Sequence, residues 1–121
     1  MKQPTKAYSN GIFVPRGADL LFLTGQVAQD SDGKVVAPYD MAEQTRFIFG
    51  QIGKILNAAE MTFDDVVKAT IFVVDMSKSS CVSSVRDEFF KNSKPASSMV
   101  GVTGLVKPEC VVEIEVIAAK Q

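Results

Sequence analysis

Short apolar runs typical of strands alternate along this chain with longer amphipathic stretches typical of helices. Residues 20–27 form an apolar run that ends at the polar, turn-forming sequence 30–33, which predicts a buried strand. Residues 11–14 form an earlier apolar run, and the Pro-Arg-Gly segment 15–17 between the two runs supplies turn chemistry. We therefore expect runs 11–14 and 20–27 to pair as an antiparallel hairpin.

A helix is predicted from about residue 41 to Ala59. Asp40 can cap its N-terminus, and Glu43 can reach back to the amide of that cap, as in a capping box. Apolar side chains recur along the helix at three- and four-residue spacing and form one stripe, which consists of Ile48, Ile52, Ile55, Leu56 and Ala59. We expect this stripe to pack on the flat face of a sheet.

The second half of the chain predicts strand, helix and two strands. Residues 66–74 are rich in β-branched side chains and indicate a central strand. A helix is expected from about Ser79 to Asn92, where Pro95 disfavours a helical residue before it. Its buried face is predicted to hold Val82, Val85, Phe89 and Phe90. Two strands follow, near 97–102 and 110–118. Both helices can cover one face of a mixed sheet, which predicts an α+β fold in a single domain over residues 1–121.

The last predicted strand carries carboxylates inside an apolar sequence. One face of it, expected under the helices, holds Val112, Ile114, Val116 and Ala118. The other face holds Val111, Glu113, Glu115 and Ile117. The strand at 66–74 is similar, because it places Val66, Thr70, Phe72 and Val74 beside Lys68. A sheet face this apolar is typical of burial against another subunit.

Glu113 and Glu115 project from the same face of that strand. Their side-chain roots are expected about 7 Å apart. Burial and a neighbouring like charge both favour a protonated carboxyl, which is how such a group becomes a proton shuttle near neutral pH. Alternatively, both carboxylates face solvent or pair with lysines. The pattern alone leaves both interpretations open.

Composition narrows the possible chemistry. The 121 residues include no histidine, which excludes Ser-His-Asp and Cys-His catalysis and histidine-ligated zinc. The formal net charge is -1 and the lysines are scattered, so nucleic acid is not an expected partner. Cys81 and Cys110 lie far apart, as expected for reduced thiols rather than a disulfide framework. No metal or cofactor is expected.

The distribution of apolar residues also bears on location. No apolar run approaches the roughly 18 residues of a membrane span, and the polar start 1–6 does not resemble a secretory signal. We therefore expect a cytoplasmic protein without a membrane partner.

Short blocks along nearly the whole chain resemble, in order, those of one protein family. Residues 7–9 resemble a Pro-Tyr-Ser opening, and residues 22–26 resemble a Phe-Val-Ser-Gly-Gln strand. Residues 43–46 read Glu-Gln-Thr-Arg, which begins a helix in that family, and residues 64–76 are similar to its next strand. Residues 112–118 are similar to its closing strand, Val-Glu-Ile-Glu-x-Ile-Ala. These blocks resemble the RidA family, which is also called YjgF.

The resemblance implies a chorismate-mutase-like α+β domain in a homotrimer, with a central barrel and ligand clefts between neighbouring subunits. Active RidA members hydrolyse reactive enamines and imines of amino acids to keto acids and ammonia, without metal or cofactor. By this resemblance, Glu113 positions water as the candidate catalytic residue, Tyr8 lines the cleft, and Gly25 matches the family pattern. Residues 104–108 are similar to the RutC-like branch of the family.

At three positions the chain departs from the family pattern. Ser97 stands where the family has the arginine that grips the substrate carboxylate, and a serine hydroxyl cannot imitate a bidentate guanidinium. Met99 replaces a cysteine, and Ser83 replaces an asparagine near the cleft. Together these changes suggest a rebuilt pocket. Arg16 and Lys94 are candidates to supply the lost charge, or else are solvated loop residues.

Two functional hypotheses follow. The first is a small-molecule enzyme that hydrolyses a C–N bond or an unstable pathway intermediate, with Glu113 as the water-positioning base and a substrate other than a simple 2-imino acid. The second is a non-catalytic trimer that binds a metabolite or a partner protein in its clefts, which the serine at position 97 favours. A ribonuclease is disfavoured, because the acidic chain has no basic stripe.

Overall fold

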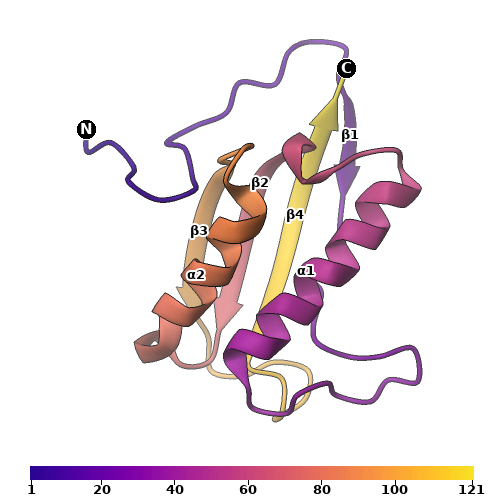
Figure 1. The fold of residues 1–121 in the computed structure, drawn as a ribbon, viewed down its shortest axis with the longest axis vertical. Coiled ribbons are helices and arrows are strands. Elements are labelled where there is room, and N and C mark those ends of the chain that lie inside the picture. Colours follow the sequence, from indigo (N-terminus) through magenta and orange to yellow (C-terminus); the bar gives the residue numbers. More distant parts are fainter.

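A four-stranded mixed sheet carries both long helices on one face in the computed structural model, which describes residues 1–121 (Figure 1). Its strands are β1 (Asp19–Phe22), β2 (Val66–Val73), β3 (Ala96–Gly101) and β4 (Val112–Lys120), in the spatial order β1-β4-β2-β3. β4 pairs antiparallel with β1 and β2, whereas β3 runs parallel to β2 and is reached through the crossover helix α2 (Ser79–Phe90). The predicted α+β fold is confirmed.

Helix α1 (Met41–Ala58) begins where its cap predicts. The Glu43 amide donates to Asp40 Oδ1 at 3.0 Å, but the reciprocal bond of a capping box is not formed, since the Asp40 amide donates to the Ala37 carbonyl instead. The predicted stripe is buried along the helix through Ile48, Ile52 and Leu56, with Ile55 partly buried. Ala59 is exposed because the helix ends at Ala58.

Aromatic packing joins α1 to α2. The Phe49 ring stacks on Phe89 with centroids 4.7 Å apart, and meets Phe90 edge-on at 5.2 Å. Val82 and Val85 are also buried, so the predicted inner face of α2 is confirmed. The helix ends at Phe90, two residues before the predicted end.

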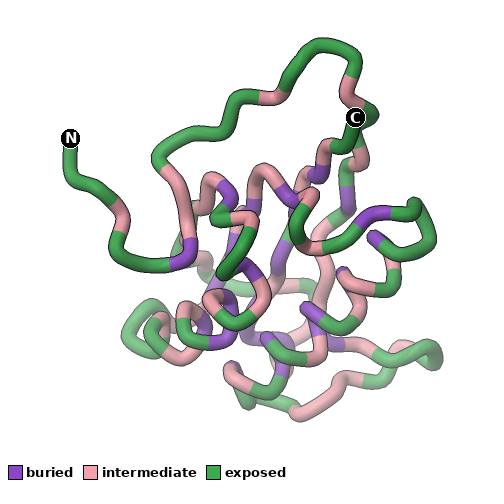
Figure 2. The backbone as a smooth tube through the Cα atoms, turned by 45° about the horizontal axis from the view of Figure 1, so that its top comes forward, coloured by how far each residue is buried: buried purple, intermediate pink, exposed green.

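The predicted hairpin between 11–14 and 20–27 is wrong. Residues 11–14 form no strand, Phe13 is 90% exposed, and the segment runs along the outside of the molecule, mostly coloured as exposed in Figure 2. β1 pairs with β4 instead, from Asp19 opposite Lys120 to Phe22 opposite Ile117. β4 has nine residues and a buried inner face, so it offers β1 a longer hydrogen-bond ladder than the four-residue run 11–14 does.

A β-bulge in β2 places Val66 on the opposite sheet face from the one predicted. Val66 was expected on the sheet face away from the helices, but it is 2% exposed and belongs to the core. The pairing register between β2 and β4 shifts between Val66 and Lys68, so side-chain alternation is interrupted there. Val74, also expected on that face, lies just past the end of β2 and packs against the core.

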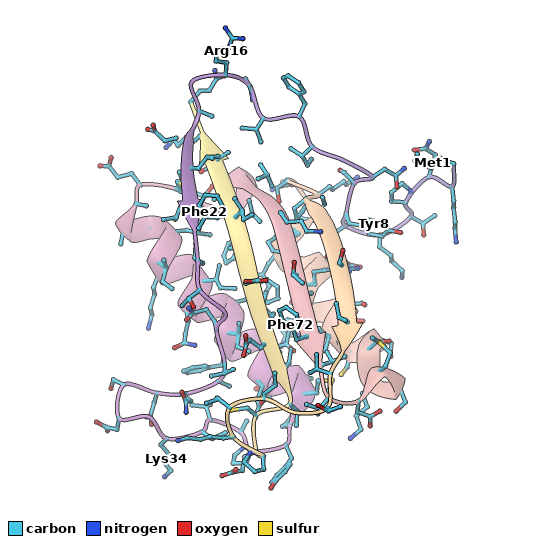
Figure 3. The ribbon with its side chains drawn as sticks, turned by 180° about the vertical axis from the view of Figure 1, so that it is seen from behind. Met1, Tyr8, Arg16, Phe22, Lys34 and Phe72 are labelled. Atoms are coloured by element: carbon cyan, nitrogen blue, oxygen red, sulfur yellow. The ribbon has the colours of Figure 1, made fainter.

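The two faces of the sheet are therefore unlike. The inner face, under the helices, consists of buried side chains, namely Ala69, Ile71, Val73, Val112, Ile114, Val116 and Ala118. The opposite face, which we call the open sheet face, consists of Leu20, Phe22, Lys68, Thr70, Phe72, Ser98, Val100, Glu113, Glu115 and Ile117. No helix covers it (Figure 3). None of the helices combines the length and apolar character needed to cross a membrane.

Candidate functional site

Glu113 lies on the open sheet face because its neighbours on β4, Val112 and Ile114, are fully buried on the inner face. It pairs across the ladder with Phe72 of β2, and its side chain is half-buried. Glu115 shares the face opposite Thr70 but is exposed. The two carboxylates predicted to share a face do so, and they differ in burial.

The backbone of Gly25 lies against the carboxylate of Glu113. A Cβ added at Gly25 would stand 2.8 Å from Glu113 Cδ and closer still to Oε2, so only a glycine leaves the carboxylate in this position. Gly25 comes to this place because the chain beyond β1 continues along β4, where Gln26 and Ile114 exchange backbone hydrogen bonds of 2.8 and 3.0 Å. The structure thus brings together the predicted residues Gly25 and Glu113.

Gln44, a fully buried residue of α1, holds the backbone just before β4 and hence the position of Glu113 along the sheet. Its Oε1 accepts from the Val111 amide at 2.9 Å, and its Nε2 donates to the carbonyls of Glu109 at 2.8 Å and Ala37 at 3.0 Å. Buried polar groups satisfied in this way hold a segment in one arrangement. Sequence reasoning matched Gln44 to the family helix but gave it no role.

Ser97 and Met99 lie elsewhere, on the edge strand β3. They pair in parallel register with Ala69 and Ile71, whose side chains face the helices, so both point to the inner side of the sheet. Met99 packs against the core. Ser97 Oγ is buried and has no hydrogen-bond partner, an arrangement that costs about 1–3 kcal/mol.

Tyr8 reaches the same edge through its neighbour. The Ser9 amide donates to the Pro95 carbonyl at 3.1 Å, and Ser9 pairs with Ala96 beside β3. The Tyr8 ring then lies under Arg86 of α2, whose Cζ is 5.6 Å from the ring centroid. Figure 3 shows Tyr8 and Phe22 at opposite edges of the sheet.

Sequence reasoning missed Arg86. The signal is a cation within the apolar stripe of α2, one residue after Val85 and one turn before Phe90. The two cations named from the sequence lie elsewhere. Lys94 is exposed and accepts a hydrogen bond from Ser9 Oγ through its backbone carbonyl, and Arg16 is an exposed loop residue at the top of Figure 3, beyond the end of β1.

The candidate residues therefore form two groups that do not meet within one chain. Gly25 and Glu113 lie on the open sheet face, whereas Tyr8, Ser97 and Met99 lie at β3, with Ser97 and Met99 on the inner side. β2 separates β3 from β4, which puts about 10 Å between these strands. One small molecule cannot touch both groups in a single copy.

Two further observations concern metals and thiols. No group of three or more acidic or cysteine side chains is placed to hold a metal ion. Cys81 and Cys110 are both free thiols. Burial, and next the carboxylate of Glu109, raise the pKa of the Cys110 thiol, which keeps it protonated and unreactive.

Comparison with known proteins decides the family. A family model described as Endoribonuclease L-PSP matches residues 2–120. The chain belongs to this family, the RidA or YjgF family. A RutC family protein of Pyrococcus horikoshii, PH0854, is 34% identical over 119 residues, which cover 98% of this chain and 91% of that protein. The 2-iminobutanoate/2-iminopropanoate deaminase of Bos taurus is 34% identical over 113 residues, covering 93% of this chain and 80% of that protein.

Solved Rid structures share the fold. YyfB of Yersinia pestis, a protein of the conserved Rid family, superposes with a TM-score of 0.83 at 28% identity, covering 93% of this chain and 86% of that one. YyfA of the same organism gives 0.77 at 38% identity, covering 92% and 86%. The family and the Rid fold predicted from the sequence are confirmed.

Proposed function

We propose that this RidA-family protein hydrolyses a reactive enamine or imine, or a related C–N intermediate, in clefts between copies of the chain. The observation that carries the proposal is the half-buried Glu113 carboxylate held against Gly25 on the open sheet face, where Phe72 pairs with it. The bovine relative is named as a deaminase of 2-imino acids, which supports the reaction class.

The chemistry needs one proton acceptor and no cofactor. Water adds to the C=N carbon of the protonated imine while Glu113 accepts a proton from it, which gives a carbinolamine with a neutral amine. Glu113 then returns this proton to the amine nitrogen, the C–N bond breaks, and the proton of the carbinolamine hydroxyl leaves with the ammonia as ammonium, so that a carbonyl product remains. An enamine first takes a proton on carbon and becomes the protonated imine.

The substrate is expected to differ from a simple 2-imino acid. Ser97 stands where the RidA family has its carboxylate-gripping arginine, and a buried serine hydroxyl supplies at most one weak donor. Release of ammonia from freshly generated 2-iminopropanoate as fast as by an arginine-bearing relative would overturn this restriction.

The open sheet face supports assembly into a homotrimer with a central barrel. Phe22 is 67% and Leu20 54% exposed in a single copy, and burial of such large apolar side chains against another copy is favourable. A second copy that brings its β3 edge beside Glu113 would also unite the two groups of candidate residues. The partners proposed are therefore a small-molecule substrate and further copies of this chain, and no nucleic acid.

Replacement of one carboxylate tests the proposal. Ammonia release is measured from imines generated in situ, both 2-imino acids from an amino-acid oxidase and imines without that carboxylate from an amine oxidase, with Glu113→Gln and the matched control Glu115→Gln. We expect E113Q to lower kcat/KM by about 10²- to 10⁴-fold, as for loss of a general base, and E115Q to stay near the wild-type value. Equal rates for E113Q and wild type, or no acceleration over buffer for any imine, would refute it.

A non-catalytic binding protein is the second candidate function, and the serine at position 97 favours it. In that case the wild type binds a metabolite or a partner protein in the cleft without turnover, and Glu113→Ala leaves this binding unchanged.

A further inference from the structure

Arg86 is the one charged residue that this chain buries. Its side chain is 9% exposed, on the side of α2 that faces the N-terminal segment. Charged groups are seldom buried to this extent unless they are paired or act on a ligand. The pairing of Arg86 is therefore informative.

Only one carboxylate oxygen engages the guanidinium. Asp87 Oδ1 lies 3.1 Å from Nε and 3.0 Å from Nη2 of Arg86, so both contacts use the same edge of the group. The Ala7 amide donates to this oxygen at 3.4 Å, which ties Asp87 to the N-terminal segment. Asp87 thus fixes the orientation of the guanidinium.

The other edge of the guanidinium is free. It presents one N–H from each Nη, parallel and coplanar, and no acceptor of the chain bonds Nη1. Nη1 is not fully enclosed, since the buried polar atoms without a partner are Ser93 Oγ and Ser97 Oγ. Two parallel donors on a planar group match the oxygens of a carboxylate.

Arg86 also lies among the predicted binding residues. It covers the ring of Tyr8, and Ser83 lies three residues earlier on the same side of α2. Tyr8 is joined through Ser9 to the start of β3, where Ser97 follows Ala96. Neither Arg16 nor Lys94 has such a place.

We propose that Arg86 is the specificity-determining anion anchor of the cleft and binds a carboxylate of the substrate through its free edge. The inference rests on the proposed function for the location of the cleft. Because the anchor stands on α2 rather than at position 97 on β3, it holds the carboxylate at a different place relative to Glu113. The free edge can hold any small carboxylate, but only one whose C=N carbon then lies beside Glu113 is hydrolysed.

Binding of a stable keto acid tests Arg86 without requiring turnover. The probe for isothermal titration is 2-oxobutanoate, and 2-butanone, which has a methyl group in place of the carboxylate, is its control. We expect the wild type to bind 2-oxobutanoate and not 2-butanone. Arg86→Lys keeps the charge but loses the bidentate edge, and should weaken binding about tenfold or more. Arg46→Lys is the matched control, because Arg46 pairs with Glu88 on the surface, and should bind as the wild type does.

A measurement on the wild-type protein tests the inference even if the R86K variant does not fold. The chain has three arginines, Arg16, Arg46 and Arg86, so their Nε–H NMR signals can be assigned by elimination. The Arg86 signal should shift with 2-oxobutanoate and not with 2-butanone. An unmoved Arg86 signal, no binding by the wild type at about 10 mM, or wild-type affinity in a folded R86K variant would overturn the inference.

The outcomes separate this inference from the proposed function. Carboxylate binding through Arg86 without hydrolysis of any imine would refute the enzymatic proposal and retain the anchor. Imine hydrolysis that R86K leaves unchanged in both KM and kcat would refute the anchor alone.

Discussion

At the scale of single residues, the candidate site depends on one close approach, between Gly25 and the Glu113 carboxylate. The sequence named both residues, through the family blocks at 22–26 and 112–118. It could not show their contact, because they come from opposite ends of the chain and meet only when β1 continues along β4. Arg86 was missed because helical periodicity indicates only that a position faces the core, and says nothing about the role of a charged residue at such a position.

A methyl group at Gly25 should separate function from stability. The carboxylate end of Glu113 is flexible and can move away from the new Cβ, so we expect Gly25→Ala to change the free energy of unfolding by less than about 1 kcal/mol. The displaced carboxylate no longer positions water, so imine hydrolysis should fall about as far as in E113Q. Urea unfolding and ammonia release measure the two effects.

Gly11→Ala is the control, because nothing lies within 4 Å of its added Cβ. A G25A protein with wild-type activity would contradict the role given to this contact.

At the scale of elements, local sequence signals predicted both helices and the central strands correctly. They failed for strand pairing, because the partner of β1 lies at the far end of the chain. Asp40 marked the start of α1, and β-branched residues marked β2. The apolar run 11–14 satisfied the same local rules as a strand, yet β4 outcompeted it for β1. The bulge between Val66 and Lys68 has no signature in the alternation, so Val66 was assigned to the wrong face.

Two glycines within α1 should respond in opposite ways. A Cβ at Gly50 meets nothing within 4 Å, so Gly50→Ala should stabilise the protein by about 0.5–1 kcal/mol through helix propensity. A Cβ at Gly53 would lie 3.2 Å from Phe63 Cε2, so Gly53→Ala should forfeit that gain. Urea unfolding of the two variants gives the comparison, and greater stability of G53A than of G50A would show that the packing between α1 and Phe63 is described wrongly.

At the scale of the whole molecule, a single copy is incomplete in two respects. Its open sheet face exposes apolar side chains such as Phe22, and its candidate residues fall into the Glu113 group and the β3 group. The sequence predicted the first, because the alternation of β4 and of residues 66–74 left a partly apolar face that no helix was expected to cover. It could not predict the second, since the side of β3 on which Ser97 lies depends on a parallel register set by α2. The proposed assembly of copies would resolve both.

Mixed oligomers test most directly whether the cleft forms between copies. E113Q and R86K, each defective in a different group, are unfolded together in equal amounts and refolded, and ammonia release is compared with that of each variant refolded alone. If every cleft takes Glu113 from one copy and Arg86 from the next, about a quarter of the clefts recover both residues, and the mixture should regain about a quarter of the wild-type rate. A mixture no more active than the average of its two components would contradict the account.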